Sequence, residues 1–490
     1  MPPKITFIGA GSLGFTRRLM QDIVTVPELS DAQLAFTDID KTNLERIANL
    51  AKRDLKHNKK GAVVTATTDR KKALEGADYI ISCVRVGGIE GFRGDIEIPL
   101  KYGIDQCVGD TLCIGGIMYG QRNIPVTLDF CRDIREVAKP DALYLNYANP
   151  NAMNTWAANN YGDVPCVGLC HGVQGGHWAI ANVIQHLINK GKKEGDKGFR
   201  SVSVDEVDII CAGLNHQTWY IQVLFDGQDW CDRLLEGFES HPWFSKAEKV
   251  RIDMLRRFGY FSTESNGHLS EYVSWYRKRP SETMKWVDLS SWINGETGGY
   301  LRVITENRHE FDKMYPKWIK DAPPDYSAAN RSHEHGSRII ESLETGRVYR
   351  GHFNVVNGHT ITNLPEDIVV EVPGYVDRNG ISIPVVGDLP TACAAICSQS
   401  AFVQRLSVEA AVEGDIEKLK QAALLDPLTG AVCTTEEISQ MVDEMVVAQA
   451  KWLPQYRHDV AAAKKRLASC KRLGTNKWKG AALLPPKKAK

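Results

Sequence analysis

Cys170 and His171 are residue types that can do chemistry, and they stand where a predicted buried strand enters a glycine-rich loop in VGLCHGVQGG. Another histidine, His216, lies further along the chain in AGLNHQTW. A thiolate and an imidazole are ligands for borderline-soft divalent cations, and a cysteine beside a histidine can also act as a nucleophile. Since a single cysteine usually packs as a small core residue, these residues alone leave a metal ligand, a nucleophile and a turn residue open.

A glycine pattern near the amino terminus indicates a dinucleotide site. Gly9, Gly11 and Gly14 form G-x-G-x-x-G around Ser12, where glycine lets a pyrophosphate approach a helix N-terminus. Asp38 ends the second predicted strand, where its carboxylate can accept hydrogen bonds from ribose hydroxyls and repel a 2′-phosphate. The pattern therefore predicts NAD rather than NADP. In the alternative, the glycines only ease a turn and Asp38 caps the next element.

The elements around these residues predict an α/β protein with two parts and a tail. Residues 1–200 alternate short apolar strands with helix-length segments, which is typical of a Rossmann-like, doubly wound sheet. Residues 201–460 begin with long alternating strands of the antiparallel kind and continue with helical stretches, so they predict an α+β lobe. Residues 461–490 contain ten Lys or Arg and no acidic residue, which predicts a solvated, partly disordered basic tail.

Apolar spacing predicts individual elements within these parts. The strands are expected in KITFIGAGSLGF, QLAFTDID, DYIISCV, ALYLNYANP, CVGLCHG and VDEVDIICAGLNHQTWYIQVLFDGQDW. The helices are expected in TRRLMQDIV, SHEHGSRIIESLETG, LPTACAAICSQSAFVQRLSVEAAVEG and TTEEISQMVDEMVVAQAKWL. Glycine closes two of these helical stretches, as it commonly does at a helix C-terminus.

Size, charge and cysteine use set the broad class. Lys+Arg and Asp+Glu number 60 each in 490 residues, so the zero net charge favours neither nucleic acid nor an anionic membrane as a partner. No window approaches 18 consecutive apolar residues and no cleavable leader is recognisable, so we expect a cytoplasmic protein. The twelve cysteines include no CxxC pair, which predicts reduced thiols rather than a disulfide scaffold or a zinc knuckle.

Nine motifs occur in the order and spacing of glycoside hydrolase family 4, which the chain resembles from Lys4 to about Tyr456, with its α-galactosidase branch the most similar. The motifs are FIGAGS, DTLCIGGI, RNIPV, NYANPNAMNTW, GLCHGVQG, GLNH, TESNGHLSEY, NLPEDIVVEV and LLDPLT. The resemblance implies a fold like that of lactate and malate dehydrogenases, and a homodimer or homotetramer that needs NAD and a divalent cation, usually Mn²⁺. It implies that Cys170 and His216 bind the cation together with the sugar's 2- and 3-hydroxyls, and that residues 201–460 serve substrate binding, metal binding and oligomerisation.

The resemblance also implies a route in which NAD oxidises C3, a base removes the acidified C2 proton, and the C1 substituent is eliminated before water adds. Tyr272 in GHLSEYVSWY matches the family's base and needs a lowered pKa, which the nearby cation can supply. Glu264 is a second candidate for proton transfer. Asp110 and His171 are candidates for polarising the leaving oxygen or positioning the sugar, and Asn149 is expected to bind sugar hydroxyls near the nicotinamide.

Substrate choice is inferred from residues next to the cation ligands. His171 stands where members that act on 6-phosphorylated sugars carry Asp or Asn, so the resemblance favours an unphosphorylated α-galactoside as the small-molecule substrate. Gly172 and Tyr119 depart from the α-galactosidase pattern, which leaves an α-glucosidase, α-glucuronidase or α-galacturonidase as alternatives. Two further alternatives are a NAD-dependent hydroxy-acid dehydrogenase, and a non-enzymatic protein that senses NAD or binds nucleic acid through the basic tail.

Overall fold

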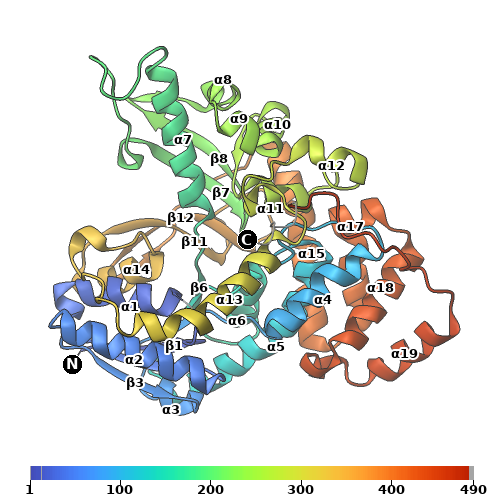
Figure 1. Ribbon diagram of the computed structural model, residues 1–490, viewed down its shortest axis with the longest axis horizontal. Helices are drawn as coiled ribbons and strands as arrows, with labels where there is room; N and C mark the ends of the chain where they lie inside the picture. Colours follow the sequence, from blue (N-terminus) through green and yellow to red (C-terminus); the bar gives the residue numbers. More distant parts are fainter. Residues whose placement is uncertain (1, 13, 485–490) are drawn as a thin grey trace.

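Six of the described strands form the parallel half of one large sheet (Figure 1). The computed structural model describes residues 2–12 and 14–484, except for the side chains at 307–310. The parallel strands are β1 (Lys4–Ile8), β2 (Gln33–Thr37), β3 (Val63–Thr67), β4 (Tyr79–Ser82), β5 (Leu143–Asn146) and β6 (Cys166–Gly168). Their spatial order is β3-β2-β1-β4-β5-β6, which is the order of a doubly wound dinucleotide-binding sheet. The prediction of a Rossmann-like sheet is confirmed.

Antiparallel strands continue this sheet beyond β6. They are β7 (Asp208–Leu214), β8 (Gln217–Phe225), β9 (Gln228–Asp229), β10 (Phe261–Ser262), β11 (Tyr349–Val356), β12 (Val369–Asp377) and β13 (Gly380–Ser382). The full order is β10-β8-β7-β12-β11-β6-β5-β4-β1-β2-β3, with β9 beside β8 and β13 beside β12. The late strands β11 and β12 thus lie between β6 and β7, where Asn354 pairs with Gly168 and Glu371 pairs with Gly213.

Helices cover the sheet and form a separate layer on one side of the molecule (Figure 1). Those that alternate with parallel strands are α1 (Phe15–Thr25), α2 (Lys41–His57), α3 (Arg70–Leu74), α4 (Gly88–Leu100), α5 (Cys113–Val137), α6 (Asn151–Asn160) and α7 (Gly172–Ile188). Those of the middle region are α8 (Leu234–Ser240), α9 (Phe244–Ala247), α10 (Lys249–Phe258), α11 (Asn266–Tyr272), α12 (Pro280–Trp286), α13 (Gly299–Trp318) and α14 (His335–Thr345). The last are α15 (Thr391–Glu413), α16 (Ile416–Leu425), α17 (Pro427–Val432), α18 (Thr435–Ala448) and α19 (Asp459–Ser469).

Local signals in the sequence set several helix ends. The Asp40 carboxylate accepts a backbone hydrogen bond at the start of α2, and Thr434 and Glu437 form a capping box at the start of α18. Gly346 and Gly414 end α14 and α15 in the left-handed conformation, with φ of 81° and 70°. The expected helices in these stretches, and their glycine ends, are confirmed.

Two large hydrophobic clusters hold the layers together. One cluster packs α5, α6, α15, α16 and α18 against the sheet and contains Trp156, Trp219 and Tyr272. The other joins β1 and β2 to α1, α2 and α14 and contains Phe7 and Phe36. Because Trp219 and Tyr272 belong to the first cluster, the packing of the late helices also holds the β8 strand and the end of α11 in place.

The sheet crosses the boundary that the sequence suggests near residue 200. Strand β6 ends before this boundary and β7 begins after it, yet β11 and β12 join them through hydrogen-bonded pairs. One sheet therefore spans the first two parts, and the division into residues 1–200, 201–460 and 461–490 stays a prediction.

The expectation of a partly disordered basic tail is wrong for the part that the structure describes. Helix α19 continues the chain to Ser469, and the segment after it packs against the protein. The backbone N–H of Asn476 donates to the Lys101 carbonyl at 3.1 Å, and Ala482 is fully buried. Residues 485–490, which contain three of the ten basic residues, lie outside the described residues.

Asp105 is one of the groups that hold the tail, together with Gln440, whose side chain accepts the Leu473 N–H at 2.7 Å and donates to the Lys471 carbonyl at 2.9 Å. The Asp105 carboxylate is fully buried, so its oxygens need donors. It pairs with Arg277, accepts the Thr297 hydroxyl at 2.8 Å and accepts the backbone N–H of Ala481 at 2.8 Å. The Thr297 N–H in turn donates to the carbonyl of Ala482 at 2.7 Å. The tail thus completes a buried polar network that residues far away in the sequence begin.

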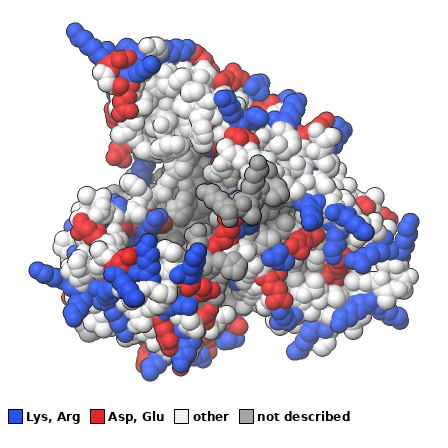
Figure 2. Space-filling model, viewed as in Figure 1, with Lys and Arg blue, Asp and Glu red and all other residues white. Residues whose placement is uncertain are grey.

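The surface mixes charges of both signs on the face in Figure 2. There Lys and Arg lie among Asp and Glu over the lower parts of the molecule, in keeping with equal totals of each. None of the helices in the described residues combines the length and apolarity needed to cross a bilayer.

Deleting residues 471–490 should lower the free energy of unfolding by at least about 2 kcal/mol, because Asp105 loses a charged hydrogen bond in a buried site. Thr297→Val should lower it by about 1.5–3 kcal/mol for the same reason. Urea denaturation followed by tryptophan fluorescence measures both. Thr305→Val, which removes a hydroxyl bonded within α13 to the Leu301 carbonyl, is the matched control and should lose less. Equal losses in the two threonine variants would contradict the role of Asp105.

Candidate active site

The structure brings Cys170 and His216 together. Cys170 lies just beyond the end of β6, and His216 lies in the tight turn between β7 and β8, where its φ of 63° is unusual for a residue other than glycine. The Nε2 atom of His216 is 3.1 Å from the Cys170 Sγ atom, and both side chains are buried. A thiol and an imidazole at this distance can share one cation, so the geometry suits the ligand pair that the sequence predicts.

Two carboxylates lie beside this pair. Glu264 joins Cys170 and His216 in a group whose ligand atoms all lie within 4.8 Å of one another. Glu371 on β12 is buried, accepts the Asn215 side-chain amide at 3.2 Å through Oε2, and has no partner for Oε1 among the described residues. Burial raises the pKa of the Cys170 thiol well above its ordinary value, and Glu371 and Glu264 raise it further. A divalent cation would offset the repulsion between these carboxylates and the Cys170 thiolate, and would stabilise the thiolate.

Gly172, the first residue of α7, makes room for Glu264. A Cβ atom at position 172 would lie 2.7 Å from Glu264 Oε1. The side chain of Glu264 therefore occupies the space that any larger residue at position 172 would need. The position of Glu264 therefore gives a steric reason for Gly172, one of the two residues that depart from the α-galactosidase pattern.

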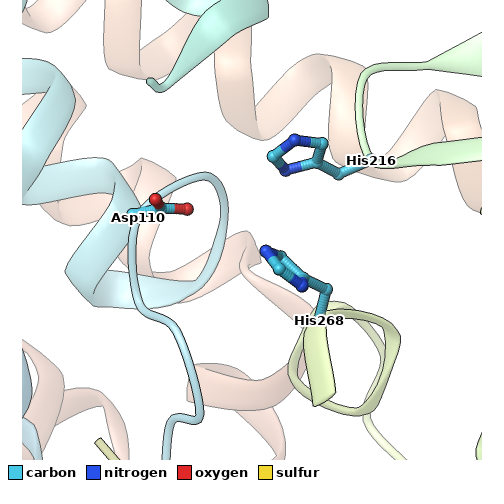
Figure 3. A group of neighbouring side chains, drawn as sticks. All are labelled: Asp110, His216 and His268. Carbon is cyan, nitrogen blue, oxygen red and sulfur yellow. The ribbon is translucent and has the colours of Figure 1, made fainter. Parts of the chain in front are cut away.

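A second group converges on His216 from the other side (Figure 3). Asp110 comes from the loop before α5, His216 from the β7–β8 turn and His268 from α11, and their side chains point toward one another. The Nδ1 atom of His268 lies 2.7 Å from Ser265 Oγ and 3.2 Å from Glu264 Oε2. Burial lowers the pKa of His268, and Glu264 opposes that effect.

Asp110 is buried and held by several donors. Its Oδ2 accepts Arg85 Nη2 at 3.3 Å and the Asn149 side-chain amide at 3.0 Å, and its Oδ1 accepts the Thr111 hydroxyl at 3.0 Å. Burial raises the pKa of Asp110, but Arg85 and the nearby histidines outweigh burial, so the pKa lies below its ordinary value. The structure thus brings together two of the sequence candidates, Asp110 and Asn149, and keeps the carboxylate ionised.

Arg85 follows β4 and forms the positive side of this contact. Its guanidinium lies over the rings of Phe92, Tyr119 and Tyr300, at 4.3, 4.4 and 5.3 Å from the ring centroids. These aromatic faces stabilise the buried cation. Tyr119, the second departure noted in the sequence, therefore serves as one wall around Arg85.

Tyr272 lies at the end of α11, fully buried, with its hydroxyl 3.4 Å from His216 Nδ1. The structure therefore brings this candidate base to the candidate cation site. Burial raises the pKa of Tyr272 well above its ordinary value, and Glu271 and Asp110 raise it further. The described side chains do not provide the lowered pKa that a base needs, so a cation would have to provide it.

Glu271, next to Tyr272, holds the loop that carries Asp110. One carboxylate oxygen accepts the backbone N–H groups of Cys107 and Val108 at 2.6 and 3.0 Å, and the other accepts that of Gly109 at 3.0 Å. Three donors on one buried carboxylate give this loop a single position relative to α11.

His171 lies at the edge of the site. Its Nε2 atom is 2.7 Å from Glu334 Oε2, and about half of its side chain is exposed. Burial lowers its pKa, but Glu334 raises it more, so the net shift is upward. The ring borders a cavity of about 630 Å³ that Gly14 and Arg18 also line. No contact among the described residues joins His171 to Asp110, so the two candidates for the leaving oxygen lie in different surroundings.

The glycine loop has the shape of a dinucleotide site. Gly9 has φ of 82°, and a Cβ atom there would lie 2.5 Å from the Cys83 carbonyl. Gly14 is the N-cap residue of α1 and has no side chain that could accept a hydrogen bond from the first turn. N–H groups of this turn are therefore available to a phosphate. Asp38 follows β2 and accepts the Gly11 N–H at 2.8 Å, so its carboxylate lies against the loop.

Ser12 takes a more local part in this loop. Its Oγ atom lies 3.2 Å from Thr16 Oγ1 and accepts the Thr16 backbone N–H at 3.3 Å. This hydroxyl therefore helps to close the turn into α1. Only its remaining hydrogen-bonding capacity is open to a ligand.

Sequence reasoning missed four residues of the site: His268, Arg85, Glu271 and Glu371. The helical spacing of four between His268 and Tyr272 could have identified the first, because residues four apart share a helix face. Glu271 and Glu371 lie within the motifs TESNGHLSEY and NLPEDIVVEV, but these motifs assign them no role, since their partners lie far away in the sequence. Arg85 carries no local signal.

Two family models match the chain. The model of the family 4 glycosyl hydrolases covers residues 4–186, and that of the family 4 glycosyl hydrolase C-terminal domain covers residues 211–429. The chain is 59% identical over 480 residues to an α-galactosidase of Rhizobium meliloti (strain 1021), covering 98% of this chain and 94% of that protein. It is 33% identical to an α-galactosidase of Bacillus subtilis (strain 168), covering 93% of this chain and 100% of that protein.

A solved structure shares the fold. The 6-phospho-β-glucosidase from Thermotoga maritima, solved with manganese, NAD⁺ and glucose-6-phosphate, superposes with a TM-score of 0.72 at 22% identity. The match covers 92% of this chain and 99% of that one. At this level of identity the similarity establishes the architecture.

Glu371 should make the metal-free protein less stable as pH rises from about 5 to 8. Burial raises the pKa of Glu371 to about 7, so the folded state keeps a proton that the unfolded state has already released. The loss amounts to about 3 kcal/mol across this window. Urea denaturation at several pH values in EDTA measures it. Glu371→Gln should flatten the profile, whereas Glu194→Gln at an exposed position should leave it unchanged. A Glu371→Gln profile as steep as that of the wild type would contradict this assignment.

Proposed function

The chain belongs to family 4 of the glycosyl hydrolases, and we propose that Cys170, His216 and Tyr272 form the site at which it cleaves the α-galactosidic bond. The protein is a glycoside hydrolase that acts on α-galactosides, which are small-molecule substrates. Its cofactors are NAD and a divalent cation, Mn²⁺.

The observation that carries this assignment is the meeting of three side chains at His216. The Nε2 atom of His216 is 3.1 Å from Cys170 Sγ, and Nδ1 is 3.4 Å from the Tyr272 hydroxyl. His216 thus lies between Cys170, the proposed cation ligand, and Tyr272, the candidate base. This arrangement supports a reaction in which a proton is removed next to a cation-bound oxygen.

The chemistry of the donor set supports Cys170 and His216 as the protein ligands to Mn²⁺. A thiolate, an imidazole and a carboxylate from Glu264 would leave coordination positions open for oxygen atoms of the sugar. The loop of Gly9, Gly11, Ser12 and Gly14 supports the dinucleotide, because its tight turn leaves no room for side chains: a Cβ atom at Gly9 would lie 2.5 Å from the Cys83 carbonyl, and one at Gly11 would lie 2.9 Å from Asp38 Oδ2. Asp38, which adjoins this loop, is the residue that we assign to the ribose hydroxyls.

When bound, NAD would supply reversible hydride transfer at C3 of the sugar, and the cation would supply Lewis-acid polarisation of the oxygen on that carbon. Tyr272 accepts the proton from C2, and the pair Asn149 and Asp110 orients the sugar hydroxyls, because the Asp110 carboxylate holds the Asn149 amide. Arg85 keeps Asp110 ionised. His171, whose pKa Glu334 raises, is the candidate that can protonate the leaving oxygen, whereas the ionised Asp110 positions the sugar. Glu264 is the second candidate for proton transfer.

His171 supports an unphosphorylated sugar as the substrate. Its imidazole pairs with Glu334, while Arg17 and Arg18 line the cavity beside it, so charge at this edge does not select against a phosphate. The support comes from the residue type at position 171, where family members that act on 6-phosphorylated sugars carry Asp or Asn.

We assign the protein to the cytoplasm as a homodimer or homotetramer. The twelve cysteines are all free, which suits a reducing compartment. Trp178 and Trp243 are each about half exposed near α7 and α9 and could contribute to a subunit contact.

Cys170→Ser should abolish most hydrolysis and weaken Mn²⁺ binding by at least tenfold, because an alcohol is a much poorer ligand than a thiolate. Assay with nitrophenyl α-galactoside and Mn²⁺ titration by electron paramagnetic resonance measure the two effects. Cys231→Ser is the control and should retain both, because this half-buried cysteine contacts the Tyr220 carbonyl and none of the proposed cation ligands. Full Mn²⁺ affinity in Cys170→Ser would remove Cys170 from the site.

Hydrolysis in heavy water should place deuterium at C2 of the released galactose, because Tyr272 exchanges the proton it removes with solvent. Nuclear magnetic resonance of the product measures it. Tyr272→Phe should lose most turnover yet still bind NAD and Mn²⁺, since only the proton-accepting oxygen is gone. No net NADH should accumulate, which distinguishes this hydrolase from a dehydrogenase. Product without C2 deuterium would contradict the mechanism and leave the family assignment intact.

A further inference from the structure

His216 is shared by two groups that could each hold a cation. One group contains Cys170 and Glu264, and the other contains Asp110 and His268. A neutral imidazole has one nitrogen with a lone pair and one with a proton, so only one of its two sides can bind a metal ion. Which side binds depends on where the proton of His216 lies.

Thr111 is the residue between His216 and Asp110. Its Oγ1 atom lies 2.9 Å from His216 Nδ1 and donates to Asp110 Oδ1 at 3.0 Å, in surroundings where Thr111 is 1% exposed. A hydroxyl has one proton to donate and can accept in return. If that proton goes to Asp110, the bond to His216 requires the imidazole to be the donor.

The contacts of Asp110 fix the direction of the hydrogen bond between Thr111 and Asp110. Its Oδ2 atom already accepts Arg85 and Asn149, and a carboxylate beside an arginine has no proton of its own to donate. Thr111 therefore donates to Oδ1. It follows that Nδ1 of His216 carries the proton, and that Nε2, which faces Cys170 at 3.1 Å, has the lone pair.

We propose that Thr111 is a positioning residue that relays the charge of Asp110 to His216, and thereby directs the cation to the side of Cys170 and Glu264. This inference rests on the cation site proposed above. Second-sphere hydrogen bonds of this kind orient a metal-binding imidazole and set its tautomer. Asp110 and His268 then stay outside the coordination sphere, on the side open to the sugar.

The test is the Mn²⁺ affinity of the NAD-loaded protein, measured by electron paramagnetic resonance after metal removal. Thr111→Val should weaken binding by about 10–100-fold, because His216 Nδ1 loses its nearer acceptor at 2.9 Å and keeps only the Tyr272 hydroxyl at 3.4 Å, whereas Thr111→Ser should stay within about threefold of wild type. Thr6→Val is the matched control. It removes a buried hydroxyl on β1 that donates to the Ala73 carbonyl, and it should not change Mn²⁺ affinity. Thermal unfolding and NAD titration establish that each variant is folded, and Thr111→Ala replaces the valine variant if that variant does not fold.

Asp110→Asn tests the relay without touching Thr111. Because Arg85 and Asn149 both donate to the Oδ2 side, the new amide must place its oxygen there and its NH₂ group toward Thr111. Thr111 would then donate to His216 Nδ1, which moves the imidazole proton to Nε2 and blocks the cation. We expect Mn²⁺ affinity to fall at least as far as in Thr111→Val.

The outcomes separate this inference from the proposed function. Normal Mn²⁺ affinity in Thr111→Val or Asp110→Asn, together with a loss in Cys170→Ser, would overturn the role of Thr111 and keep the cation site. An equal loss in Thr111→Ser and Thr111→Val would also overturn it, because the hydroxyl would then not be the cause. Normal affinity in Cys170→Ser would overturn the site itself.

Discussion

The arrangement of the site depends on the junction between the parallel and antiparallel halves of the sheet. Gly168 and Gly213 are the residues at which β11 and β12 join β6 and β7. A Cβ atom at Gly168 would lie 2.0 Å from Asn151 Oδ1, and one at Gly213 would lie 2.6 Å from the Gln217 carbonyl. A Cβ atom at Gly168 would also lie 2.8 Å from the Cβ atom of Asn354, so glycine there lets β11 join β6, whereas glycine at position 213 lets the Gln217 backbone of β8 approach β7. These pairings bring together the ends of β6 and β7, where Cys170 Sγ and His216 Nε2 are 3.1 Å apart.

Helix α11 is the second element on which the chemistry depends. It presents Tyr272 and His268 to the site, while Glu271 on another face holds the loop of Asp110 by three backbone hydrogen bonds. One short helix thus sets the distances among Tyr272, which is the proposed base, His268 and the Asp110 loop. A change in its packing would move all three together.

Electrostatics explain why the cation belongs to the folded site. Glu264, Glu371 and the Cys170 thiol lie close together in a buried region, and burial raises the pKa of Glu371 and of Cys170. Asp110 differs because Arg85 neutralises it. Among the described residues, neither Glu264 nor Glu371 forms an ion pair with an arginine, and Arg251 acts on Glu264 only at longer range. The side of His216 that faces Cys170 is therefore the side on which a divalent ion gains the most.

The sequence by itself determined the residue types of the site and the local elements. The glycine pattern from Gly9 to Gly14, the acid Asp38 and the motifs around Cys170, His216 and Tyr272 are local signals, because they record the needs of one turn, one strand end or one ligand. Only the tertiary structure decided which of these residues meet. The contacts of Thr111 with His216, of Glu271 with the Asp110 loop and of the tail with Asp105 join residues more than 100 positions apart, and periodicity and composition do not encode such register. The charge of the tail predicts disorder, whereas its order depends on groups outside the tail, among them the buried carboxylate of Asp105.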